Sequence, residues 1–512
     1  MSLFVKKSIQ QLLSTADGEK SLKRTLGSGS LIALGIGAII GAGLFVRTAA
    51  AAGGFAGPAV TISFIVAAIG CAFAGLCYAE FASIIPIAGS AYTYAYATMG
   101  EIIAWVIGWA LILEYALGAA TVSISWSEYA NRLLSGGVPG KGIPYEWCHS
   151  PMESAIVNGV HHHGIINLPA LVILLALSLL LVKGTQESAI VNAVIVILKV
   201  AIVLVFIAIG WGFIQAKNHT PYLIPATAPP ALLPDGTTYS YLDFFRHGWG
   251  GVLRGAGIVF FAFIGFDAVS TAAQEAKNPK KDMPIGILGS LVICTVLYIL
   301  FSWVLTGVAP YQDFMHAGKE ASVAYAISTY MTGYGWLSTL VTVAILLGFS
   351  SVILVMLLGQ SRVFYTMSTD GLLPKIFSDL HPKFRTPYKS NLLLFVFVGA
   401  FAAFLPETVA GDLTSIGTLF AFVVVCVGVM VLRKKDPNLV RPFKTPLVPL
   451  VPILGIIICA AMIVSLPGRT QLSALAWMVV GLIIYFSYSK NNSKLGSAGD
   501  ALPTASDFEK LG

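Results

Sequence analysis

Apolar runs long enough to cross a membrane recur along this chain of 512 residues. Each run has roughly 18–25 residues, the length that a helix needs to span a hydrocarbon core of ~30 Å. In lipid every backbone N–H and C=O must be satisfied internally, so repeated runs of this length predict a helical bundle. Charged residues make up 11% of the chain, too few to cover a soluble surface. The sequence therefore predicts an all-α polytopic membrane protein.

Twelve membrane-spanning helices are predicted, with both ends of the chain in the cytoplasm. Of the 31 lysines and arginines, 22 fall in the predicted cytoplasmic segments and seven, Arg47 among them, on the outer side. This asymmetry follows the positive-inside rule. The basic residues behind the net charge of +7 therefore set the orientation in the membrane, and no nucleic acid partner is needed to explain them. The predicted spans are 28–50, 57–83, 100–133, 166–183, 188–213, 249–276, 284–309, 335–364, 390–405, 414–432, 448–466 and 471–488.

A weak internal repeat organises the chain. Span 1 reads GIGAIIGAGLFV and span 6 reads FFAFIGFDAV, so both carry glycine at mid-membrane depth, five spans apart. An odd offset forces opposite orientations, and interrupted helices in two inverted halves indicate a transporter binding site. The expected parts are a cytoplasmic N-terminal segment (1–27), a first repeat (28–213), an outer loop (214–248), a second repeat (249–432), spans 11 and 12 (433–490) and a flexible cytoplasmic tail (491–512).

The backbone at the two interruptions predicts a site for a zwitterion. If span 1 opens at 40–43, the N–H groups of Ala42 and Gly43 become the positive end of a half-helix, where a carboxylate can dock. The carbonyls of Ile39, Phe261 and Ile264 would then be free to accept from an ammonium group. An α-amino acid carries both charges one carbon apart. The alternative for the glycines of span 1 is close helix packing through small residues.

Lys199 lies 11 residues into span 5, which places it ~16 Å deep, near the bilayer midplane. A lysine there costs at least ~2.5 kcal/mol on insertion scales and is a functional candidate. Burial disfavours its charged form, which suits it to exchanging a proton. As a cation it would contact span 1 carbonyls and Ser350 and Ser351 in span 8. We therefore predict proton coupling through Lys199.

Two acidic residues also lie within the predicted bilayer. Asp267 follows the span 6 interruption by three residues, and Glu114 lies ~20 Å into span 3. Either carboxylate would face a basic substrate side chain, titrate, or serve as a structural partner. These alternatives stay open.

These segments resemble the amino acid–polyamine–organocation superfamily, most closely the bacterial homologues of the cationic amino acid transporters. The similarity covers spans 1–10 and continues less distinctively to span 12. The matching stretches are LKRTLGSGSLIALGIGAIIGAGLFV, AEFASIIPIAGSAYTYAY, GWALILEYAL, FFAFIGFDAVSTAAQEAKNPKK and MSTDGLLP. The resemblance implies the LeuT-type fold, a five-plus-five inverted repeat with two added helices.

The resemblance also implies roles for individual residues. Glycine and alanine backbone at 41–43 would bind the carboxylate, and carbonyls at the two interruptions would bind the ammonium group. Phe263 and Phe266 would wall or gate the pocket, and Lys199 corresponds to the span 5 lysine of proton-coupled members. The expected substrate-binding residues are Ile39, Ile40, Gly41, Ala42, Gly43, Glu114, Phe261, Ala262, Phe263, Ile264, Phe266, Asp267, Ser350 and Ser351.

The predicted function is a proton-coupled symporter of the cell membrane, which carries small neutral L-amino acids, cationic ones or both by alternating access. Substrate, protons and membrane lipid are its expected partners. An amino acid/product antiporter is one alternative, and a receptor or channel with the same fold is another. No enzyme motif or cofactor site is visible, and the run 161–163 of three histidines is interpreted as a polar loop without metal.

Overall fold

The computed structural model describes residues 4–7, 26–85, 90–136, 138, 141–157, 159–184, 189–233, 235–267, 269–270, 273, 276–316, 322–384 and 386–497. The predicted N-terminal segment and C-terminal tail therefore lie largely outside the described residues. Apolar sequence favours helix here because helices satisfy their own backbone groups. Seven helical segments of the described chain are long and apolar enough to cross a membrane, and five shorter apolar helices accompany them.

The described α-helices have the following bounds, in chain order. They are α2 (Ser28–Ile39), α3 (Thr48–Ala51), α4 (Val60–Ile84), α5 (Ser90–Thr98), α6 (Glu101–Ser135), α7 (Leu168–Lys183), α8 (Ala189–Gly210), α9 (Gly248–Val259), α10 (Pro279–Val308), α11 (Asp313–His316), α12 (Ser322–Tyr330), α13 (Gly335–Thr369), α14 (Tyr388–Phe404), α15 (Glu407–Lys435), α16 (Leu450–Ser465), α17 (Gly468–Ile484), α18 (Lys490–Asn492) and α19 (Lys494–Ser497).

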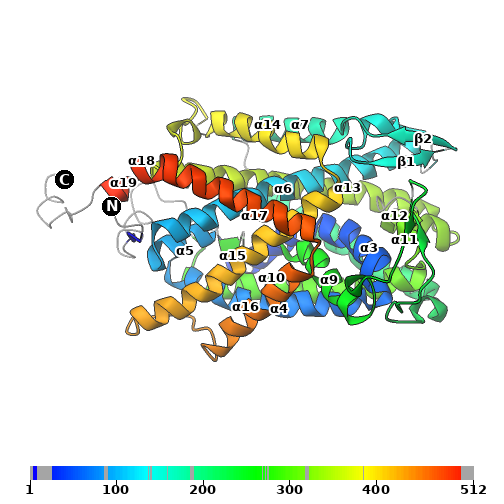
Figure 1. Ribbon diagram of the computed structural model, residues 1–512, viewed down its shortest axis with the longest axis horizontal. Helices are drawn as coiled ribbons and strands as arrows, with labels where there is room; N and C mark the ends of the chain where they lie inside the picture. Colours follow the sequence, from blue (N-terminus) through cyan, green and yellow to red (C-terminus); the bar gives the residue numbers. More distant parts are fainter. Residues whose placement is uncertain are drawn as a thin grey trace, which may run out of the picture.

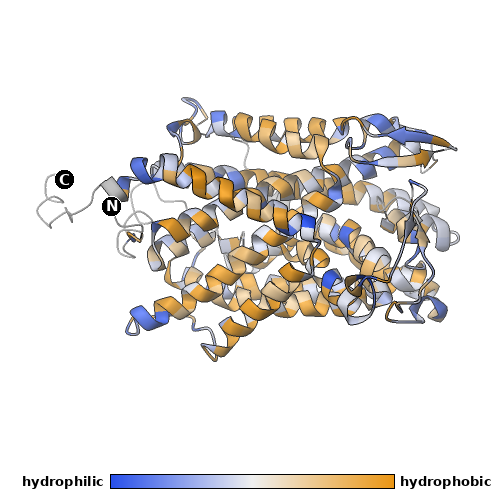
Figure 2. Ribbon diagram, viewed as in Figure 1, coloured by the Kyte–Doolittle hydropathy of each residue, from blue (hydrophilic) through white to orange (hydrophobic). Residues whose placement is uncertain are grey.

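The long helices lie side by side in one elongated bundle (Figure 1). Helices α6 and α13 pack against each other in its middle, and α7 packs on α14 along one edge. One end of the bundle, here called the α5 end, carries α5, α18 and α19; the opposite end, the hairpin end, carries β1, β2, α11 and α12. Hydrophobic residues cover the helices along their length and hydrophilic residues gather towards the two ends, as expected for a membrane protein (Figure 2).

The polar connections hold structure that hydropathy did not predict. Strand β1 (Ser154–Val157) pairs antiparallel with β2 (Val160–His163), with Ser154 opposite His163. A second hairpin joins β3 (Ala231–Leu232) and β4 (Thr238–Tyr239). The three histidines therefore form strand β2, and among the described residues no cluster suited to a metal ion is found. The stretch predicted as a helical loop at 311–332 contains α11 and α12, with 317–321 outside the described residues.

Span 6 is interrupted, as the sequence predicts. Helix α9 ends at Val259, a 3-10 turn follows over η8 (Phe260–Phe263), and among the described residues the next α-helix begins at Pro279. Residues 268, 271–272 and 274–275 lie outside the described residues. Gly265 has a φ of 112°, a conformation that suits glycine and cannot continue a right-handed helix.

Arg47, which the charge count places on the outer side, is buried and not exposed to solvent. It lies at the end of the π-helical turn η1 (Gly43–Arg47) and is only 1% exposed. Its guanidinium pairs with Glu407 at 3.5 Å and with Asp412, both in the first turns of α15. A side chain at Gly411 would meet the guanidinium carbon at 2.9 Å, so glycine leaves room for the charge. Hydropathy alone cannot distinguish a surface charge from one buried by partners distant in the chain.

Candidate functional site

The first helix interruption lies at Ile40 and Gly41. Helix α2 ends at Ile39, and Ile40 adopts an extended conformation with ψ of 105°. Helical structure resumes at Ala42 as the π-helical turn η1, continues through α3, and ends in a second π-helical turn, η2 (Ala52–Ala56). The N–H of Ile40 still closes the last turn of α2 by donating to Ile36 at 2.9 Å. The non-helical backbone at 40–41 therefore separates two helical segments.

The two interrupted segments touch each other directly. A methyl group on Gly43 would overlap the Cα of Ala262, and one on Gly265 would lie 2.9 Å from the carbonyl oxygen of Ala38. Both glycines are needed for this close backbone approach. The two segments therefore contact each other backbone to backbone at Gly43 and Ala262.

Tyr298 of α10 joins the two interruptions through its hydroxyl group. Its oxygen lies 3.1 Å from the carbonyl oxygen of Ile39 and 2.9 Å from that of Ala262. A tyrosine hydroxyl has one proton, so it donates to these two acceptors in turn or shares the proton between them. The ring is fully buried, with Phe263 packed edge to face against it and Phe64 packed at a tilt. Tyr298 therefore connects the two interrupted segments through backbone carbonyl groups at their breaks.

The predicted carbonyl acceptors are partly occupied. The Ile39 oxygen accepts from Tyr298, and the Phe261 oxygen accepts from the N–H of Ile264 at 3.2 Å within the turn that follows η8. Each of these two carbonyl oxygens therefore already accepts one hydrogen bond, because an unpaired carbonyl buried in a membrane protein costs several kcal/mol. Each oxygen has a second lone pair, so a further donor could bond there. The binding of an ammonium group at these carbonyls stays a prediction.

Lys199 lies beside the first interruption. Its side chain is 1% exposed, and Nζ donates to the carbonyl oxygen of Gly37 at 2.7 Å, one turn before the break in α2. Its methylene stem packs on Gly348 of α13, where a Cβ would lie 2.9 Å from the lysine Cε. The ammonium group of Lys199 thus forms a hydrogen bond to α2, and the methylene stem of Lys199 contacts α13. Its position links a titratable group to the backbone of the interrupted helix.

The two acidic residues are both buried in the packed interior. Glu114 of α6 and Asp267 are at most 1% exposed, and their carboxyl groups are near enough to interact electrostatically. The hydroxyl of Tyr115 donates to Asp267 at 3.4 Å. Gly417 of α15 packs on the Glu114 backbone, with its Cβ position 3.7 Å from the Glu114 nitrogen. Burial disfavours a negative charge on both groups at once.

The remaining predicted residues fall into two groups. Phe263 stacks on Phe64 and Tyr298, whereas Phe266 packs against Tyr78 and Phe422, so the two phenylalanines lie in different aromatic clusters. In α13, Ser350 donates to the carbonyl of Leu346 at 2.9 Å, and Ser351 is buried. The α13 residue that meets the first interruption is Val352, whose methyl group lies 3.1 Å from the Cβ position of Gly41.

Tyr298 and Val352 were missed by the sequence analysis. Val352 carries no signal, because valine is ordinary in an apolar span. Tyr298 did carry one: a tyrosine in the middle of a membrane span must find a partner for its hydroxyl, as any polar side chain there must. The sequence could not say which partner.

Removal of the Tyr298 hydroxyl tests its bridging role. We expect Tyr298→Phe to lower the stability of the protein by about 1–3 kcal/mol, because two buried carbonyls lose their shared donor. The measurement is the midpoint of thermal unfolding of the purified protein. Tyr239→Phe is the matched control, since that hydroxyl donates to the single, less buried carbonyl of Gly54 at 2.9 Å. Equal losses in the two variants would contradict a bridge between the interruptions.

Comparison with known proteins identifies the family. Residues 26–488 match the amino acid permease family. The chain belongs to this family. The match confirms the predicted resemblance, and it makes the chain a member of a family of membrane transporters rather than an enzyme.

The names of three curated relatives mention different substrates. The branched-chain amino acid permease BcaP of Bacillus subtilis (strain 168) is 45% identical over 494 residues, which cover 96% of this chain and 99% of the relative. A methylthioribose transporter of the same organism is 41% identical over the same shares of both chains. The chloroplastic cationic amino acid transporter 9 of Arabidopsis thaliana is 38% identical over 430 residues, 84% of this chain and 70% of the relative.

Proposed function

We propose that this permease is a proton-coupled symporter that takes up neutral branched-chain and other small L-amino acids. The observation that carries the proposal is the meeting of two interrupted helices at Gly43 and Ala262, with Tyr298 bonded to both and Lys199 bonded to the first. Separation of the two segments would free N–H groups at 42–43 for a carboxylate and the Ile39 carbonyl for an ammonium group. These are the two charges of a zwitterion.

The proposed architecture is the LeuT-type fold with twelve spans. It combines two inverted five-span repeats, residues 28–213 and 249–432, with two added helices. The interruptions of α2 and of the segment after α9 fall at corresponding places in the two repeats, which supports this division. We place the α5 end in the cytoplasm of a cell membrane because the excess of lysine and arginine favours that orientation.

The walls around the interruptions favour an aliphatic side chain. Val352 contacts the Cβ position of Gly41, Ile39 and Ile40 precede it in the chain, and all three side chains are buried and branched. A hydrophobic pocket distinguishes aliphatic substrates by about 1–3 kcal/mol per methylene group. The name of the relative with 45% identity points the same way.

The test is uptake by the purified permease in liposomes with an alkaline interior. We expect saturable accumulation of labelled leucine above its external concentration, driven by the pH gradient and inhibited by isoleucine and valine. Empty liposomes provide the background. Uptake that does not saturate would indicate a channel. Acceleration by unlabelled internal amino acid, with no accumulation from a pH gradient, would support the antiporter alternative.

A cationic substrate is the second candidate, because two buried carboxyl groups, those of Glu114 and Asp267, are near enough to interact with each other. A guanidinium or ammonium group between two carboxylates would be stabilised there. In the same uptake experiment, arginine that competes with leucine more strongly than valine does would favour this candidate. Methylthioribose serves as a further competitor, since it lacks the carboxylate that the half-helix would bind.

A further inference from the structure

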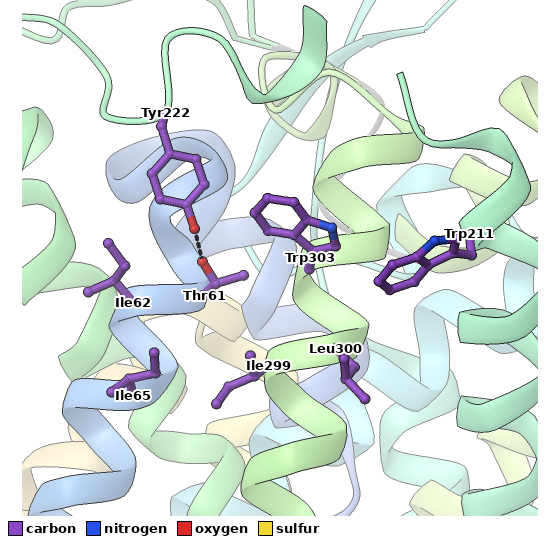
Figure 3. Close-up of a pocket in the computed structure, with 8 residues that line it drawn as sticks. All are labelled: Thr61, Ile62, Ile65, Trp211, Tyr222, Ile299, Leu300 and Trp303. Carbon is purple, nitrogen blue, oxygen red and sulfur yellow. Dashed lines mark hydrogen bonds between the residues drawn. The ribbon is translucent and has the colours of Figure 1, made fainter. Parts of the chain in front are cut away.

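A membrane-facing groove lies behind the candidate site. It is a cavity of about 370 Å³ between α4 and α10, closed at one end by Trp211 of η5 (Trp211–Phe213) (Figure 3). Isoleucine and leucine side chains from both helices form its walls, Ile62 and Ile65 on α4 and Ile299 and Leu300 on α10. Two hydroxyl groups at the rim, those of Thr61 and Tyr222, are hydrogen-bonded to each other.

The groove opens sideways, towards the bilayer. Ile65 is 41% exposed, Leu300 36% and Trp211 54%, and all three lie in segments that are apolar and long enough to span a membrane. An apolar cavity does not hold water well, because water there finds no polar partners. In a membrane protein the apolar material available at such an opening is lipid hydrocarbon.

The rim places the groove near the headgroup level. Trp211, Trp303 and Tyr222 are gathered there, and such amphipathic rings are enriched where the hydrocarbon meets the headgroups. The His219 ring packs on Trp303 at 4.1 Å, in the turn η6 (Ala216–His219), which also presents the exposed Lys217. The cation lies on the polar side of the aromatic rim, where a phosphate group would be.

We propose that this groove binds one acyl chain of a membrane phospholipid, with the headgroup beside η6. The inference rests on the membrane position of the permease, not on its substrate or on proton coupling. The apolar lining and the aromatic rim fit a hydrocarbon chain, because a polar ligand would find few partners among the isoleucine and leucine side chains.

The acyl chain would lie directly behind the interrupted helices. Ile299 in the groove wall is the neighbour of Tyr298, whose hydroxyl bonds both interruptions. On α4, the Phe64 ring packs at a tilt against Tyr298 with ring centres 5.4 Å apart, and Phe64 is the chain neighbour of Ile65 in the groove. The groove is therefore separated from the two interruptions by one layer of helix.

The test uses phospholipids with brominated acyl chains, which quench tryptophan fluorescence on contact. The full-length permease is placed in vesicles of brominated phosphatidylcholine and then mixed with excess unbrominated vesicles. The fluorescence of the natural protein minus that of Trp303→Phe gives the signal of Trp303, which lies in the groove. The difference for Trp336→Phe reports on ordinary lipid contact, since Trp336 of α13 is 60% exposed. We expect the Trp303 signal to recover at least tenfold more slowly than the Trp336 signal.

A blocking variant completes the test. Leu300→Phe fills the groove without adding a tryptophan, and it should abolish the slow component while leaving the Trp336 signal unchanged. Equal recovery at the two tryptophans, or a slow component that survives Leu300→Phe, would show exchanging surface lipid only and overturn the proposal. Quenching requires no transport, so failure of the proposed amino acid uptake would leave this result interpretable.

Discussion

Replacement of Lys199 by alanine will abolish pH-driven accumulation of amino acid, with a loss of at least tenfold relative to the natural permease. The ammonium group bonds the Gly37 carbonyl just before the break in α2, at 2.7 Å. A hydrogen bond to a charged group contributes about 1.5–3 kcal/mol, more than one to a neutral group. Gain or loss of a proton at Nζ therefore changes how firmly the end of α2 is held. The measurement is uptake of labelled leucine into liposomes with an imposed pH gradient.

Two further variants separate proton coupling from packing. Lys199→Met keeps the stem that packs on Gly348 and removes only the charge, so it should behave like Lys199→Ala in uptake. Lys389→Ala is the matched control, because Lys389 forms an exposed pair with Asp379 and should leave accumulation unchanged. Both Lys199 variants should still exchange external for internal substrate without a gradient. Uptake in Lys199→Ala that continues to follow the pH gradient would refute the assigned role.

Arg47→Leu will destabilise the permease by about 3–5 kcal/mol. It removes the cation from a buried cluster and leaves Glu407 and Asp412 without their partner, and an uncompensated buried charge carries a cost of this size. The effect should be visible as a large drop in the midpoint of thermal unfolding. Arg132→Leu is the control, since Arg132 makes an exposed hydrogen bond to Ser328 and its loss should cost at most about 1 kcal/mol.

A neutralised cluster provides the second half of this test. In the triple variant Arg47→Leu, Glu407→Gln, Asp412→Asn no charge remains, so more than half of the lost stability should return. A triple variant as unstable as Arg47→Leu alone would mean that the arginine acts through its packing. A single variant as stable as Arg132→Leu would mean that the buried ion pairs contribute nothing measurable.

The amino-acid sequence by itself determined the membrane class and the positions of the interruptions. These properties are local: a run of apolar residues specifies a buried helix, and the glycine at 265 permits the backbone to leave it. The membrane depth of Lys199 stays a prediction of the sequence. Hydropathy gave no sign of the β hairpins in the polar connections.

Only the tertiary structure decided which groups meet. Tyr298 bonds Ile39 across 259 positions in the chain, and Arg47 reaches Asp412 across 365. A buried hydroxyl or charge requires a partner, and the sequence shows that requirement without showing the partner. The partner is set by how distant helices pack, so the pairing of Lys199 with Gly37 and the closure of Gly43 on Ala262 follow from the packed bundle alone.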